Sequence, residues 1–153
     1  MKMLKYGALT VGLLLATCAG ARAGLWTEDL DKAQAQAKSQ NKYVFLDFTG
    51  SDWCGWCMKL EREVFSQKEF KEFAEANLVC VTVDFPRQKA QSMKQKKANA
   101  ALQKKYGVGG YPTIIILSPD GKLVGQTGYK AGGAAPYVAS LKQIIDQAKA
   151  GTK

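Results

Sequence analysis

The chain has 153 residues, and 46% of them are hydrophobic, which is enough for one globular domain with one core. Its formal net charge is +9. Because the chain contains no histidine, imidazole acid–base catalysis and Cys/His zinc sites are excluded. One close cysteine pair and a distant third cysteine also make a poor zinc set. We therefore expect no metal site and no bound cofactor.

Residues 1–23 have the order of a secretory signal peptide. Lys2 and Lys5 precede an apolar stretch over 9–16, and the small residues Ala21 and Ala23 follow. The apolar stretch is well short of the ~20 residues that a membrane-spanning helix needs. A second interpretation is a lipoprotein signal in which Cys18 is lipidated. We favour cleavage after residue 23.

Cleavage at that point leaves a domain of residues 24–153 with a formal charge of +6. We expect this domain in the periplasm of a Gram-negative bacterium, an oxidising compartment where structural disulfides persist. Nucleic acid is not an expected partner of such an exported protein. We see no internal repeat or low-complexity linker, and we expect a monomer.

The first predicted elements of this domain alternate between helix and strand. A polar, alanine-rich helix is predicted over 28–40, with Thr27 as its N-cap. Residues 43–48 form a continuous apolar run, typical of a strand that helices bury on both faces. A helix then begins at the close cysteine pair and covers 54–64. A capping-box pattern at 66–69 predicts that a new helix starts there.

The second half of the domain contains one more buried strand, a lysine-rich helix, an antiparallel hairpin and a last helix. Their predicted ranges are 78–85, 87–106, 114–117 with 122–127, and 136–148. The short turn between the last two strands makes them a hairpin. This order predicts an α/β fold with a central mixed sheet, helices on both faces, and a C-terminal β-hairpin plus helix.

The lysine-rich helix has a narrow apolar stripe, formed by Ala98, Leu102 and Tyr106 at four-residue spacing. Its other faces must be in contact with water. We interpret the lysines as a solvated face, with the docking of an acidic partner or an anionic membrane surface as the alternative. These lysines are Lys94, Lys96, Lys97, Lys104 and Lys105.

The most informative motif is a Cys-x-x-Cys at Cys54 and Cys57, placed where a helix is predicted to begin. Three-residue spacing puts both sulfurs on one helical face, close enough to form a disulfide. Free backbone N–H groups and the positive end of the helix dipole favour a thiolate at Cys54. A thiolate beside a second thiol is suited to disulfide exchange, so we predict a redox-active disulfide with Cys54 as its nucleophile.

Residues around the pair have both structural and functional interpretations. Trp53 and Trp56 either pack against the fold or form an apolar rim that grips substrate peptides, and we favour the rim. Asp47, at the end of the first buried strand, is either a satisfied polar group or a carboxylate of raised pKa that accepts a thiol proton. Cys80 lies inside a predicted strand, and we favour an inert core thiol over a third exchanging thiol.

These motifs resemble the thioredoxin superfamily over nearly all of residues 25–150. The matching residues are the Trp-Cys-x-x-Cys motif at 53–57, the strand aspartate Asp47, Val83-Asp84, the Tyr-Gly-Val sequence at 106–108, and Tyr111-Pro112-Thr113. The resemblance implies a thioredoxin-like fold. It also implies that the peptide bond before Pro112 is cis and that Tyr111 offers backbone groups to an extended substrate.

The resemblance further implies roles for the acid and the two thiols. Cys54 would attack a substrate disulfide, Cys57 would resolve the mixed disulfide, and Asp47 would help to move the proton of Cys57. The strongly oxidising members of the superfamily resemble this chain less, because no cation lies between the sulfurs and Asp52 stands just before them.

We therefore predict an exported thiol:disulfide oxidoreductase that reduces or isomerises protein disulfides. A reductase in an oxidising compartment must be recharged, so the resemblance implies an electron donor such as a membrane thiol transporter. The alternatives are a periplasmic dithiol oxidase and a non-enzymatic module, in which the two thiols hold Cu(I) or the fold binds unfolded peptide.

Overall fold

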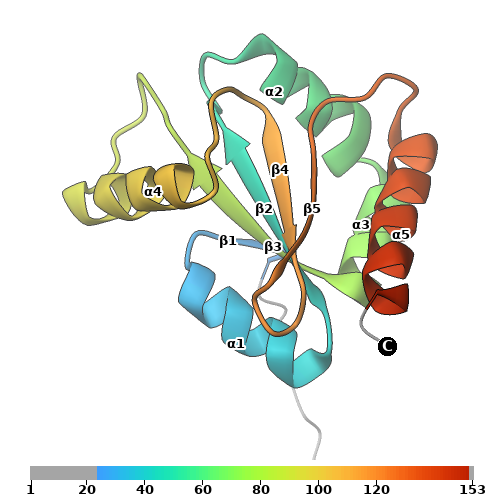
Figure 1. Ribbon diagram of the computed structural model, residues 1–153. Coiled ribbons are helices and arrows are strands. Elements are labelled where there is room, and N and C mark those ends of the chain that lie inside the picture. Colours follow the sequence, from blue (N-terminus) through green and yellow to red (C-terminus); the bar gives the residue numbers. More distant parts are fainter. Residues whose placement is uncertain (1–23, 152–153) are drawn as a thin grey trace, which may run out of the picture.

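A five-stranded mixed sheet forms the centre of the computed structural model, which describes residues 24–151 (Figure 1). The strand order is β1-β3-β2-β4-β5. Strands β1, β3 and β2 run parallel, β4 is antiparallel to β2, and β5 is antiparallel to β4. Their bounds are Trp26–Thr27, Tyr43–Thr49, Leu78–Asp84, Thr113–Leu117 and Leu123–Thr127 for β1 to β5. The interpretation of residues 1–23, including Cys18, lies outside the described residues.

Strand β2 is buried along its whole length because helices cover both faces of the sheet. Its side chains alternate between two cores. Phe45 packs with helices α3 (Lys68–Asn77) and α5 (Ala134–Ala150) on one face, whereas Leu46 packs with helix α1 (Leu30–Gln40) on the other. This two-sided burial confirms the interpretation of the apolar run.

The helices form two outer layers (Figure 1). Helices α1 and α4 cover one face of the sheet, and α2, α3 and α5 cover the other. Helix α2 continues directly into a π-helix. The bounds are Leu30–Gln40 for α1, Gly55–Leu60 for α2, Glu61–Phe65 for the π-helix, Lys68–Asn77 for α3, Met93–Lys105 for α4 and Ala134–Ala150 for α5.

Two predicted helix caps were wrong. The N-cap of α1 is Asp29, whose carboxylate accepts the N–H of Lys32, while the Thr27 hydroxyl accepts the N–H of Asp29. Ser66 does not start α3, because its hydroxyl donates to the carbonyl of Arg62 in the preceding turn. The two-residue strand β1 was not predicted.

Helix α4 also differs from its prediction. It begins at Met93, with Ser92 as its N-cap, so 87–92 is a loop. Its buried residue is Asn99, whereas Ala98 is exposed. Amide side chains at four-residue spacing face the rest of the protein instead of an apolar stripe, and Leu102 and Tyr106 complete the contact.

The architecture confirms the predicted fold class, with a mixed sheet between helical layers and a hairpin followed by a helix at the C-terminal end. Within residues 24–151, no helix combines the length and the apolar character needed to cross a bilayer. The loop after β2 and the loop before β4 meet at one edge of the sheet, beside the start of α2 (Figure 1).

Candidate active site

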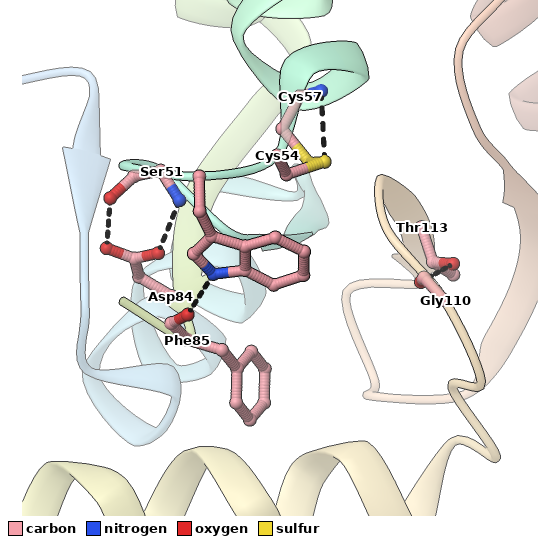
Figure 2. The surroundings of a disulfide bond; sticks show 8 residues. Ser51, Cys54, Cys57, Asp84, Phe85, Gly110 and Thr113 are labelled. Carbon is pink, nitrogen blue, oxygen red and sulfur yellow. Dashed lines mark hydrogen bonds between the residues drawn. A yellow bond between two sulfur atoms is a disulfide. The ribbon is translucent and has the colours of Figure 1, made fainter. Parts of the chain in front are cut away.

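Cys54 and Cys57 form a disulfide at the start of α2, with their Cα atoms 5.2 Å apart. Cys54 is the N-cap residue, and its sulfur accepts the N–H of Cys57 at 3.3 Å (Figure 2). Both residues are largely buried, with 7% and 6% of their surface exposed. The sulfur of Cys54 thus occupies the position where a negative charge meets an unpaired helical N–H.

The loop that leads to the cysteines is held by two carboxylates. Asp84, the last residue of β3, accepts hydrogen bonds from the backbone N–H and the hydroxyl of Ser51 (Figure 2). Asp52 accepts the backbone N–H groups of Arg87, Gln88 and Lys89 at 2.8–2.9 Å, and these bonds hold its pKa below the usual range. The carboxylate of Asp52 therefore holds the backbone of residues 87–89 in place.

Trp53 is fixed in place beside the disulfide. Its indole N–H donates to the carbonyl of Phe85 at 2.8 Å, and its ring stands edge-on to Tyr111 at 5.8 Å between centroids. The guanidinium of Arg87 lies 3.8 Å from the centre of the indole. Gly50 makes room for the ring, because a Cβ there would come within 2.5 Å of it. These contacts fix the orientation of the Trp53 ring, next to Cys54 in the sequence.

Trp56 is exposed, with 58% of its surface accessible. Its ring lies 5.0 Å from that of Tyr129, and the ammonium of Lys59 stands over both rings. The Tyr129 hydroxyl donates to Glu63 at 2.8 Å. Sequence reasoning missed Tyr129, since it follows β5 and no local pattern links it to the cysteines.

The loop before β4 faces the disulfide from the other side (Figure 2). The Tyr111–Pro112 peptide bond is cis, and the hydroxyl of Thr113 donates to the carbonyl of Gly110 at 2.7 Å. The Tyr111 hydroxyl accepts a hydrogen bond from the side chain of Gln103 in α4. The cis proline presents no N–H toward the sulfurs.

A pocket of about 300 Å³ opens beside Cys57. Asp47 lies at its buried side, and its Oδ1 has no hydrogen-bond partner among the described residues. Burial, and then the charges of Glu61 and Asp84, raise the pKa of Asp47 to about 8. Glu61 borders the same pocket and was missed, although its position one helical turn after Cys57 could have indicated it.

Cys80 is separate from this chemistry. It lies in β3 with no exposed surface, forms no disulfide, and its pKa is raised because the thiol is buried. A buried, protonated thiol is inert toward exchange. In residues 24–151, no cluster of three or more cysteine or acidic side chains could hold a metal ion.

A family model described as a thioredoxin-like domain matches residues 30–144. The chain belongs to the thioredoxin-like family. It is 34% identical to the disulfide bond reductase DsbH of Chlamydia pneumoniae, over 95% of this chain and 98% of that protein. A solved structure of a DsbH oxidoreductase superposes with a TM-score of 0.75 and 33% identity, over 88% of this chain and 94% of that one.

A second similarity of this thioredoxin-like chain is to the thiol:disulfide interchange protein DsbD of Cronobacter sakazakii, with 34% identity. That match covers 61% of this chain and 14% of DsbD. Together with the Cys54–Cys57 disulfide, these relationships confirm the predicted class: the chain is a thiol:disulfide oxidoreductase.

Proposed function

We propose that this protein is exported to the periplasm and reduces or isomerises disulfides of client proteins there. One observation carries the proposal: the sulfur of Cys54 is the N-cap of α2 and accepts the N–H of Cys57, an arrangement that stabilises a Cys54 thiolate. The name of DsbH, a disulfide bond reductase that matches nearly the whole chain, supports the reducing direction.

In the proposed cycle, the Cys54 thiolate of the reduced protein attacks one sulfur of a client disulfide. The client bond breaks, a mixed disulfide forms, and the second client sulfur leaves as a thiolate that takes a proton. Cys57 then loses its proton to Asp47, whose pKa of about 8 suits proton transfer near neutral pH. The Cys57 thiolate attacks Cys54, which re-forms the internal disulfide and releases a reduced client.

Aromatic side chains near the disulfide form the proposed client-binding rim. Trp53 and Tyr111 contact each other edge-on, and the exposed ring of Trp56 lies between the two cysteines in the sequence. The backbone at Tyr111 and Pro112 would align an extended client chain next to Cys54. Such a rim favours apolar segments and leaves the client sequence otherwise unrestricted.

The proposed cycle consumes two electrons per client disulfide, so an electron donor must reduce the protein again. The similarity to DsbD, a thiol:disulfide interchange protein, supports a membrane thiol transporter in that role. Residues 1–23 would act as the export signal, with Cys18 as the lipid-attachment residue in the alternative. We propose that the exported domain works as a monomer.

The test is the capture of clients by Cys57→Ser. Without the resolving thiol, mixed disulfides through Cys54 should accumulate as reductant-sensitive adducts with exported proteins. Cys54→Ser is the matched control and should form none, because the buried Cys57 lacks the N-terminal stabilisation of its thiolate. Equal adduct formation by the two variants would contradict the assignment of the nucleophile.

The direction of the reaction is tested by equilibrating the protein with glutathione buffers and measuring the fraction oxidised. A reduction potential near that of thioredoxin, about −270 mV, is expected for a reductase. A value near that of the strong oxidants, about −120 mV, would show that the protein donates disulfides instead.

A further inference from the structure

Positive charge is concentrated in one segment of the chain. Residues 87–119 contain seven lysines and arginines and no acidic residue. The rest of residues 24–153 contains twelve basic and thirteen acidic residues, which is close to neutral. The excess charge of the exported domain therefore comes from the 87–92 loop and helix α4.

This charge is free to act on a partner. The five lysines of α4 are exposed, and none of them forms a salt bridge with a carboxylate of residues 24–151. They are Lys94, Lys96, Lys97, Lys104 and Lys105, which we call the α4 cationic face. Glu28, whose backbone carbonyl accepts from Gln95, borders this face near its N-terminal end. Unpaired surface cations project an attractive field for anionic groups.

Amide side chains in α4 and in the loop before it hold this face in a fixed position relative to the active site. Gln91 and Asn99 both donate to the backbone carbonyl of Asp84, the residue whose carboxylate holds Ser51. Farther along the helix, Gln103 donates to the hydroxyl of Tyr111. The α4 cationic face is thus connected to both loops that flank the disulfide.

Arg87 and Lys89 extend the positive surface toward the loop that leads to the disulfide, where the carboxylate of Asp52 offsets part of their charge. Arg87 stacks on the indole of Trp53, and the ammonium of Lys89 donates to the hydroxyl of Ser51 at 3.1 Å. Trp53 in turn donates its indole N–H to the carbonyl of Phe85, just before the 87–92 loop. Because Gln103 of α4 binds the hydroxyl of Tyr111, a client chain that contacts Trp53 and Tyr111 would lie next to this helix.

We propose that the α4 cationic face binds a carboxylate-rich segment of a client protein, next to the disulfide that the enzyme reduces. The proposal rests on the proposed function and specifies its client class. The inner side of α4 is occupied by its contacts with the protein, and Met93 is its one large exposed apolar side chain among the described residues, so the helix has little to insert into a bilayer. Its charge and its continuity with the rim fit a protein segment.

The test compares two peptides that contain the same disulfide, one flanked by glutamates and one by glutamines. The rate constant kcat/KM of their reduction should favour the acidic peptide about tenfold at low ionic strength, and the ratio should approach one in high salt. Glutamine substitution of the five lysines of the α4 cationic face should remove the preference. A control with the same loss of charge, at Lys38, Lys68, Lys122, Lys142 and Lys149, should keep it.

A second measurement does not depend on turnover. A glutamate-rich peptide without cysteine should bind the wild-type protein and the control variant, and binding should be weakened about tenfold in the α4 variant. Binding that is equal in all three proteins would overturn the proposal even if disulfide reduction is intact. Phosphatidylserine vesicles that bind through the α4 lysines while the acidic peptide does not would overturn it too, in favour of a membrane surface.

Discussion

Asp47 and Glu61 border one pocket beside Cys57, and the charge of Glu61 adds to burial in raising the pKa of Asp47. Glu61 also has a raised pKa because it is partly buried, an effect that Lys71 opposes. A buried acid that lies near a second carboxylate can retain its proton near neutral pH. The pocket therefore places the proposed proton acceptor Asp47, and a charge that raises its pKa, beside Cys57, the proposed resolving cysteine.

The first prediction concerns the stability of the oxidised protein with Asp47→Asn. Between about pH 4 and pH 8, Asp47 is ionised in the unfolded chain but protonated in the fold, so the free energy of unfolding should fall as pH rises. The total decrease in the free energy of unfolding from pH 4 to pH 8 should be on the order of a few kcal/mol, since each pKa unit corresponds to about 1.4 kcal/mol. Asp47→Asn should abolish this part of the fall, as measured by urea unfolding across that range.

The acidic pH range provides an internal control for that experiment. Below about pH 4, wild type and variant should differ little in pH dependence, because Asp47 is protonated in both states. Parallel stability curves for the two proteins from pH 4 to pH 8 would show that Asp47 titrates normally.

The second prediction is that Glu61→Gln lowers the pKa of Asp47 without restoring its ordinary value. The substitution removes one negative charge, while burial, the larger cause, remains. The midpoint of the pH dependence of stability should move to lower pH, and alkylation of Cys57 in the reduced protein should follow a shifted pH profile. Glu69→Gln, an exposed substitution in the first turn of α3, is the control and should leave both profiles in place.

The third prediction concerns the space that Gly50 leaves for Trp53. Gly50→Ala would place a methyl group within 2.5 Å of the indole, so the ring must move away from the carbonyl of Phe85. We expect a loss of about 1–3 kcal/mol in the free energy of unfolding and a changed near-ultraviolet circular dichroism signal. Gly109→Ala, where a Cβ meets nothing within 4 Å, should change neither, and equal effects of the two would contradict the packing argument.

The fourth prediction tests how α4 is attached. Asn99 is buried, donates to the carbonyl of Asp84, and accepts from Gln95. Asn99→Ala should lower the free energy of unfolding by about 1–3 kcal/mol, because it leaves buried polar groups without partners. Amide hydrogen exchange should accelerate most in α4, and Lys97→Ala on the exposed side should alter it little. Unchanged exchange in Asn99→Ala would mean that apolar contacts hold the helix.

Periodicity and motif spacing predicted the parts of the fold that depend on local pattern. The buried strands, the helix at Cys54 and the C-terminal hairpin were all found in this way, since two-sided burial produces continuous apolar runs. The close cysteine spacing likewise predicted the disulfide and the free N–H that contacts Cys54.

Contacts between distant segments account for what could not be predicted. The helix was expected to start at Arg87, but the Asp52 carboxylate binds the backbone N–H groups of 87–89 and keeps them in a loop. The inward side of α4 was expected to be apolar. Instead, Asn99 in α4 and Gln91 just before it donate to the backbone carbonyl of Asp84, which only the folded sheet brings within reach. Neither interaction has a signature in the neighbouring sequence.

The burial of Cys80 makes its thiol a natural probe of global unfolding in the oxidised protein. With Cys54 and Cys57 joined, the thiol of Cys80 is the free one in residues 24–151, and it is fully covered in β3. A maleimide pulse can modify this position only in molecules whose sheet has come apart. The labelled fraction after such a pulse therefore measures how many molecules unfolded during it. The measurement needs neither denaturant nor an engineered probe.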